Sequence, residues 1–100
     1  MYAYVWEYRV SAEMRAAFEA AYGPDGEWVQ LFRRGRGYVG TELLRDRADA
    51  TRYLTIGHWE SAELFASFRR QFSGECAALA ARFEAMTSLE RSRGNFDVVT

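Results

Sequence analysis

A stretch of ten residues near the middle of the chain carries the side chains best suited to binding a ligand. Residues 52–61 read Arg-Tyr-Leu-Thr-Ile-Gly-His-Trp-Glu-Ser. Because side chains on a strand alternate between two faces, Thr55, Gly57 and Trp59 share one face. Gly57 has no side chain, so we expect a hollow beside the Trp59 indole. The Thr55 hydroxyl and the Trp59 N–H would offer hydrogen bonds to a ligand in that hollow.

The remaining site residues are expected to come from segments distant in sequence. Tyr8, on a predicted first strand, joins Trp59 and Thr55 as a candidate catalytic residue. The expected pocket-lining residues come from the helical regions: Phe32, Arg33, Phe65, Phe68 and Phe72. A cavity of aromatic walls with few polar groups is typical of a small-molecule site. In the competing interpretation, Trp59 is only a core residue at a strand–helix corner.

Alternating and helical patterns predict the elements that position these residues. Residues 2–9 form a first strand whose four aromatic side chains share one buried face: Tyr2, Tyr4, Trp6 and Tyr8. Residues 38–45 and 52–59 form two strands joined by a hairpin, and residues 95–99 form a fourth after a charged linker at residues 88–94. Ser11 and Ser61 are predicted to cap helices that follow the first and third strands.

The predicted order is strand, helix, strand, strand, helix, strand. It is the split βαβ order of a ferredoxin-like α+β fold, with both helical regions on one side of a four-stranded antiparallel sheet. A chain of 100 residues suits one domain over residues 1–100. The face of the hairpin strands opposite Trp59 is predicted to carry four apolar residues: Val39, Leu43, Leu54 and Ile56. An apolar face of this kind predicts a homodimer in which two sheets pack face to face.

Composition limits the classes of ligand and cofactor. The formal net charge of −1 gives no field to attract nucleic acid or an anionic membrane. The absence of lysine excludes Schiff-base chemistry, and a single His58 and a single Cys76 have no partners at metal-ligand spacing. We therefore expect no metal and no organic cofactor. No apolar segment approaches the ~20 residues needed to span a bilayer, and no secretory signal precedes the first strand, so a cytoplasmic protein is predicted.

Four segments together resemble the antibiotic biosynthesis monooxygenase (ABM) family. They read Val-Trp-Glu-Tyr-Arg-Val at residues 5–10, Tyr-Gly-Pro-Asp-Gly-Glu-Trp at 22–28, Gly-Tyr-Val-Gly-Thr-Glu-Leu-Leu-Arg-Asp at 37–46, and the stretch at 52–61 that ends in Trp-Glu-Ser. The resemblance covers nearly the whole chain and implies a dimeric α+β barrel. It also implies cofactor-independent oxygenation of polyketide anthrones and related quinols, the activity of the family's best-understood branch.

The chain departs from that branch at two positions. Where those oxygenases place an Asn four residues before the Trp, this chain has Thr55, and where they place a Tyr six residues after it, this chain has Phe65. A second branch degrades haem with an Asn, a Trp and a haem-ligating His. The matching positions here are Tyr8, Phe68 and Ala78, so the resemblance disfavours haem degradation.

The sequence therefore predicts a monooxygenase that joins O₂ to an electron-rich aromatic molecule without a cofactor. Two other functions on the same barrel stay open. One is a polyketide cyclase or isomerase, and the other is an accessory protein that binds a small molecule without converting it. Oxygen consumption separates the first function from both alternatives.

Overall fold

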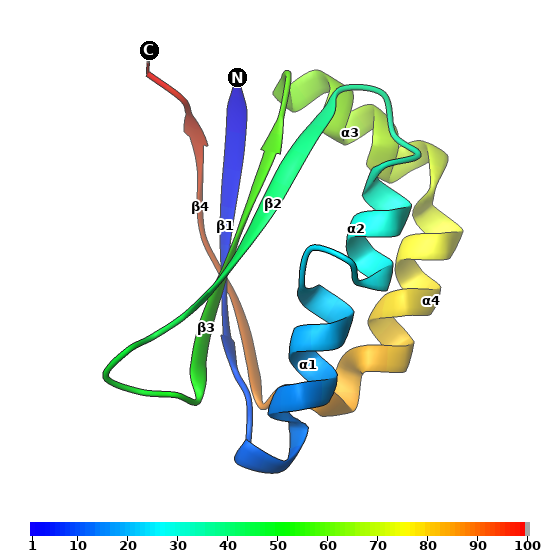
Figure 1. Cartoon of the computed structure of the whole chain (residues 1–100). Helices are drawn as coiled ribbons and strands as arrows, with labels where there is room; N and C mark the ends of the chain where they lie inside the picture. Colours follow the sequence, from blue (N-terminus) through cyan, green and yellow to red (C-terminus); the bar gives the residue numbers. More distant parts are fainter. Residues whose placement is uncertain (100) are drawn as a thin grey trace.

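A four-stranded antiparallel sheet with all helices on one face makes up the computed structural model, which describes residues 1–99 and leaves Thr100 outside the described residues (Figure 1). The strands are β1 (Tyr2–Arg9), β2 (Tyr38–Arg45), β3 (Arg52–Trp59) and β4 (Leu89–Asp97). The helices are α1 (Arg15–Tyr22), α2 (Glu27–Phe32), α3 (Ala62–Gln71) and α4 (Ser73–Phe83), with 3₁₀ turns at Ala12–Met14 and Glu84–Met86. The strand order β2-β3-β1-β4 confirms the predicted ferredoxin-like α+β fold.

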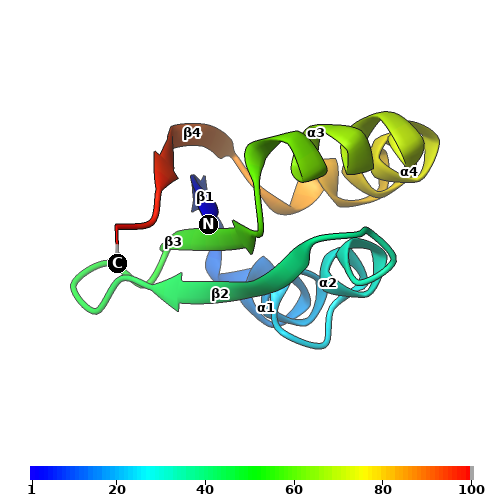
Figure 2. The same cartoon turned by 90° about the horizontal axis from the view of Figure 1, so that it is seen from above.

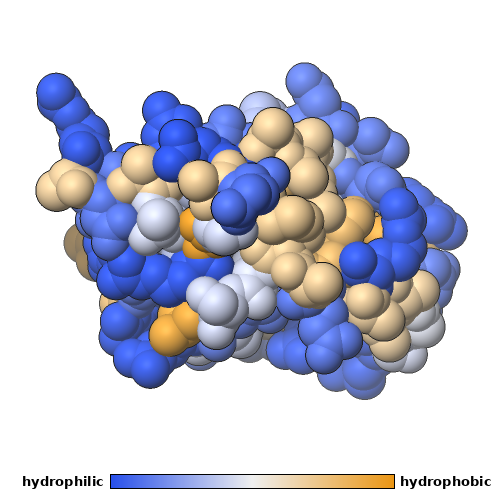
Figure 3. Space-filling model, turned by 90° about the horizontal axis from the view of Figure 1, so that it is seen from below, coloured by the Kyte–Doolittle hydropathy of each residue, from blue (hydrophilic) through white to orange (hydrophobic). Residues whose placement is uncertain are grey.

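The helices form a second layer against the sheet. Seen from above, α3 and α4 lie on the side of β1 and β4, and α1 and α2 lie on the side of β2 (Figure 2). Seen from below, hydrophilic residues surround a broad area of moderately hydrophobic residues, and strongly hydrophobic residues appear only as small spots (Figure 3).

The alternation predicted for β3 is confirmed. Tyr53, Thr55 and Trp59 are buried against the helices, whereas Leu54 and Ile56 on the other face remain partly exposed. The predicted cap at Ser61 is also confirmed, because its side-chain oxygen accepts a hydrogen bond from the Leu64 backbone N–H at 3.1 Å. The strand therefore passes directly into α3.

Three local predictions are wrong. The Ser11 side chain makes no capping hydrogen bond, and the chain enters α1 through a 3₁₀ turn instead. Trp6 is 37% exposed, because the helices leave a cavity over this part of the inner face of β1. The predicted charged linker at residues 88–94 is mostly strand β4, which pairs with β1 over its length and contains an irregularity opposite Val5 and Trp6. An edge strand tolerates such charges because one side of it meets water.

The register between β2 and β3 corrects the predicted outer face. Leu43 pairs with Thr55, so Leu43 packs on the core side rather than outward, and the pairing skips Val39. The apolar residues of the outer face come from all four strands: Val5, Leu44, Leu54, Ile56 and Phe96. Alternation along one strand divides its side chains into two sets, but it does not show which set lies on the same face of the sheet as a given set of the neighbouring strand. The prediction for β2 was wrong for this reason.

A charged group interrupts this apolar outer face. Glu7 is only 4% exposed, and its carboxylate accepts hydrogen bonds from Arg52 Nε at 2.8 Å and Arg93 Nε at 2.6 Å. These bonds hold the pKa of Glu7 below its usual value. A buried carboxylate between two guanidinium groups is tolerated because each of its oxygens has a charged donor.

Candidate functional site

A cavity of about 810 Å³ lies between the sheet and the helices α3 and α4. Its sheet wall carries the four aromatic residues of the inner face of β1, Tyr2, Tyr4, Trp6 and Tyr8, together with Glu90, Ser92 and Asn95 of β4. Phe32, Phe65 and Phe68 contribute further rings from the helices. A cavity of this size and composition suits a flat aromatic ligand.

Small side chains on the helices leave this space open. Ala62 and Ala66 of α3 and Ala77 and Ala80 of α4 line the cavity, as does Ser73 at the start of α4. A side chain longer than a methyl group at these positions would extend toward the aromatic wall of β1. The hollow therefore results from small residues on the helices opposite large ones on the sheet.

The hollow predicted beside Trp59 is not where the sequence placed it. Tyr4 pairs with Gly57 across β1 and β3, and a Cβ atom at Gly57 would lie 2.3 Å from the Tyr4 ring. The missing side chain of Gly57 thus makes room for the Tyr4 phenol, which stacks on Phe65 with ring centroids 4.7 Å apart. A neighbouring strand filled the space that the pattern on β3 left open.

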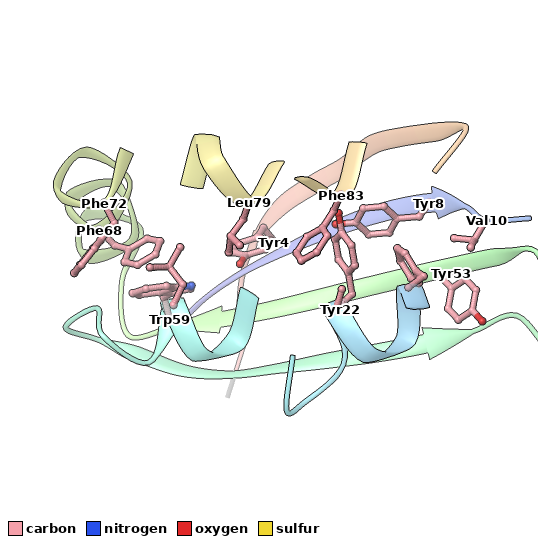
Figure 4. Close-up of a cluster of buried hydrophobic side chains, with 13 residues drawn as sticks. Tyr4, Tyr8, Val10, Tyr22, Tyr53, Trp59, Phe68, Phe72, Leu79 and Phe83 are labelled. Carbon is pink, nitrogen blue, oxygen red and sulfur yellow. The ribbon is translucent and has the colours of Figure 1, made fainter. Parts of the chain in front are cut away.

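Three predicted site residues lie outside the cavity wall. Trp59 is 0% exposed and packs with Phe68 and Phe72 at one end of the hydrophobic core (Figure 4). Phe72 is buried there beneath the Arg34 guanidinium, 4.9 Å from the ring centre. Arg33 points away, and its guanidinium donates to the Pro24 carbonyl at 3.4 Å. The other predicted residues, Tyr8, Thr55, Phe32, Phe65 and Phe68, do line the cavity.

Tyr8 and Thr55 form a polar pair in the cavity wall. Their hydroxyl oxygens are 3.4 Å apart, and either can be the donor. Burial raises the pKa of Tyr8 well above its usual value, although the hydrogen bond from Thr55 opposes this effect. Tyr8 is therefore protonated at neutral pH and can donate a hydrogen bond to an anionic ligand.

A second polar group lies where α1, α2 and β4 meet the cavity. The Tyr22 hydroxyl donates to Glu90 Oε1 at 3.5 Å, and Tyr22 packs edge-on against Tyr8 with ring centroids 5.1 Å apart. Burial, reinforced by the charge of Glu90, raises the pKa of Tyr22 to about 12. The Trp28 indole N–H nearby is buried without a hydrogen-bond partner among the described residues.

The opposite end of the cavity carries different polar groups. The Tyr2 hydroxyl donates to Asn95 Oδ1 at 2.8 Å, and the Arg69 guanidinium lies 5.8 Å from the centre of the Phe65 ring. Arg69 and Glu90 are the charged side chains among the described cavity-lining residues. The cavity therefore has a cation toward the Tyr2 end of β1 and a carboxylate toward the Tyr8 end.

Sequence reasoning missed several residues of this wall. The β1 residues could have been included, because the strand's aromatic face was already recognised: Tyr2, Tyr4 and Trp6. Glu90 had no such signal, since residues 88–94 were predicted to be a linker, and Asn95 was predicted to begin the fourth strand without a role in the site. Tyr22 and Trp28 reach the cavity only through the packing of α1 and α2.

Residues 1–99 contain no group of three or more His, Cys, Asp or Glu side chains placed to hold a metal ion. Among the same residues, no helix is long and apolar enough to cross a membrane.

Comparison with solved structures identifies several proteins of the same fold. The chain is similar to a candidate antibiotic biosynthesis monooxygenase from Deinococcus radiodurans, with a TM-score of 0.78, 12% identity, and coverage of 100% of this chain and 94% of that one. A mutant of SnoaB, a cofactor-independent oxygenase from Streptomyces nogalater, has a TM-score of 0.74 and 22% identity over 99% of this chain and 93% of that one. A variant of MhuD, with two manganese protoporphyrin IX molecules per active site, has a TM-score of 0.74 and 22% identity over 100% of this chain and 96% of that one.

The sequence matches a family profile but no individual curated protein. No curated protein sequence matches the chain. The sequence profile of the family "Antibiotic biosynthesis monooxygenase" matches residues 1–82, most of the chain and all of its elements as far as α4. The chain therefore belongs to the antibiotic biosynthesis monooxygenase family.

Proposed function

We propose that this protein is a cofactor-independent monooxygenase that oxidises a planar, electron-rich aromatic molecule, such as a quinol, an anthrone or a related polyketide. The observation that carries the proposal is the cavity itself, about 810 Å³ walled by aromatic rings and containing a few hydroxyl groups. Aromatic rings pack favourably against one another in offset or edge-on arrangements. SnoaB, which shares the fold, is a cofactor-independent oxygenase and supports the same class of reaction.

The chemistry requires little from the protein beyond binding and electrostatics. An electron-rich ring that loses a proton becomes an anion that can pass electrons to O₂ directly. For an anthrone, the ring CH₂ becomes C=O, one atom of O₂ enters this carbonyl, and the other leaves in water. The protein must hold the ring, favour its anion by hydrogen bonding and exclude bulk water.

We assign the hydrogen bond to the ring oxygen to the Tyr8–Thr55 pair. The two hydroxyls are 3.4 Å apart, so a ligand oxygen can displace this long contact and accept a stronger bond from Tyr8. Trp6, exposed on the inner face between Tyr4 and Tyr8, provides a flat surface on which the ligand can stack. In this assignment Trp59 supports the wall from the core and does not touch the substrate.

We infer that the protein works as a homodimer, in keeping with the typical state of its family. The apolar residues on the outer face of the sheet provide the contact surface, with Leu54 and Ile56 near its middle. The cavities lie on the helix side of each sheet, so this dimer would leave them open to substrate and O₂.

Oxygen consumption with dithranol, a simple anthrone, tests the proposed function. The wild type should consume one O₂ per anthrone and transfer one labelled oxygen atom from isotopic O₂ to the quinone product. Tyr8→Phe should lower kcat/KM about 10-fold through loss of one hydrogen bond. The matched control is Tyr53→Phe, which removes a buried hydroxyl bonded to Glu19 outside the cavity and should leave kcat/KM unchanged.

Other outcomes would identify the competing functions. Tight binding of dithranol or an anthraquinone without oxygen uptake would indicate an accessory binding protein, and a rearranged product without oxygen uptake would indicate a cyclase or isomerase. Stoichiometric binding of haemin followed by its oxygen-dependent loss would indicate haem degradation. Each of these results would refute the oxygenase proposal.

A further inference from the structure

Glu90 occupies a position in the cavity that no other acidic side chain shares among the described residues. It lies on β4 directly opposite Tyr8 of β1. Its Oε1 atom accepts hydrogen bonds from the Tyr22 hydroxyl at 3.5 Å and from Thr87 Oγ1 at 3.3 Å. Both bonds are long, and the other carboxylate oxygen has no partner among the described residues. These bonds orient the carboxylate but leave one of its oxygens available to accept a proton.

The other polar groups of the cavity wall are poor proton acceptors. Arg69 stays protonated and has no acceptor atom, and an Asn95 amide is not basic. Burial raises the pKa values of Tyr8 and Tyr22, and burial also raises that of the Cys76 thiol, so these groups keep their protons at neutral pH. An oxygenase that must form a substrate anion in this cavity therefore has one suitable base.

Tyr22 fixes the direction of this base. Its ring is buried between Phe18, stacked at 4.3 Å, and Phe83 at 5.9 Å, so its hydroxyl cannot turn away from β4 without disturbing the core. The raised pKa of about 12 keeps the hydroxyl protonated and therefore a donor to Glu90. Tyr22 is a positioning residue, since it acts through the carboxylate.

Trp28 supplies an unexplained donor beside this pair. The Trp28 and Tyr22 ring centroids are 6.4 Å apart, and the indole N–H is close enough to the Tyr22 hydroxyl to oppose the rise in its pKa. The two groups do not meet the geometry of a hydrogen bond, and no other atom of the described residues accepts one from this N–H. Buried polar groups are almost always hydrogen-bonded, so an unpartnered N–H requires an explanation. Trp28 lines the cavity, and an acceptor on a bound ligand would satisfy it.

We propose that Glu90 is the catalytic base of the cavity and that the Trp28 N–H donates a second hydrogen bond, beside that of Tyr8, to the oxygen of the substrate anion that Glu90 generates. The inference rests on the proposed oxygenase function and assigns roles to residues beyond the Tyr8–Thr55 pair. The ring C–H bond breaks, its proton moves to a Glu90 oxygen, and its electron pair stays on the ring and spreads to the ring oxygen. O₂ takes the electrons and bonds to the ring carbon. The second ring C–H bond and the O–O bond then break, which leaves the ring C=O, and the released oxygen atom leaves as water with the second ring proton and the proton from Glu90.

The first experiment compares Glu90→Gln with Glu84→Gln, a matched change on the exposed turn after α4 that lies outside the cavity. Oxygen uptake with dithranol is measured as a function of pH, and binding of 9,10-anthraquinone is followed by tryptophan fluorescence. Glu90→Gln should lower kcat about 100-fold near neutral pH, the scale of general-base catalysis, with little change in anthraquinone affinity. Its rate should approach that of the wild type at alkaline pH, where dithranol ionises without help.

The second experiment measures Trp28→Phe, which keeps an aromatic ring but lacks the N–H. It should lower kcat about 10-fold, the value of one hydrogen bond to an anion, with little change in thermal stability. Wild-type rates in Glu90→Gln, or a deficit that persists unchanged at high pH, would overturn the assignment of the base while leaving the oxygenase proposal intact. Absence of oxygen uptake by the wild type would overturn both.

Discussion

Two tryptophans with unpartnered indole N–H groups give a direct test of which part of the molecule is core and which is site. Trp59 and Trp28 both have buried N–H atoms without acceptors among the described residues. Trp59 is fully buried and absent from the cavity wall, whereas Trp28 is part of that wall. The same substitution, Trp→Phe, should therefore have opposite consequences at the two positions.

The magnitude for Trp59→Phe follows from the atoms removed. Two buried ring carbons at about 0.8 kcal/mol each represent a loss of ~1.6 kcal/mol. The vacated space adds about 1 kcal/mol, and removing an unpartnered N–H returns about 1 kcal/mol. The free energy of unfolding should thus fall by about 1–2 kcal/mol, which lowers the Tm of a domain of this size by roughly 5–15 °C.

The assay combines thermal unfolding, at one fixed protein concentration, with anthraquinone binding and oxygen uptake. Trp59→Phe should lower the Tm and leave the Kd for anthraquinone and the rate per folded protein unchanged. Trp28→Phe should leave the Tm nearly unchanged and lower the rate. If Trp59→Phe instead kept the wild-type Tm and weakened ligand binding or turnover, the indole would be part of the site, and the placement of Trp59 in the core would be refuted.

Three further predictions concern the packing, the assembly and the acid stability of the sheet. Gly57→Ala should destabilise the fold by about 1–3 kcal/mol in thermal unfolding, because the added Cβ meets the Tyr4 ring. Gly74→Ala, in an open position on α4, is the control and should be neutral or stabilising. Equal Tm values for the two variants would contradict the close packing at Gly57. Leu54→Asp should give monomer or insoluble protein in sedimentation, and a wild type that sediments as a monomer at micromolar concentration would refute the dimer. Because the pKa of Glu7 is lowered in the folded state, its ionised form stabilises the protein fully above the usual pKa of 4.5, and this stabilisation is lost as the pH falls through the folded-state pKa. Glu7→Gln should therefore reduce the fall of Tm below pH 4.5. An unchanged dependence of Tm on acid pH would show that Glu7 is not responsible.

The sequence by itself determined the order of the elements and the two faces of β3. The alternation of Tyr53, Thr55 and Trp59 against Leu54 and Ile56 defines the two faces of β3 without reference to any other segment. The Ser61 cap likewise depends only on the backbone of the next turn. These features are local, because strand alternation and helix capping involve residues within a few positions of one another.

The tertiary structure decided where the cavity lies and which residues reach it. Gly57 marks a missing side chain in the sequence, but only the β1–β3 register shows that the Tyr4 ring fills that space. Glu90 reaches the site because β4 pairs with β1, which places it opposite Tyr8 from more than eighty positions away. Register and cavity shape depend on how side chains from distant segments fit together, and no pattern within one segment contains that information.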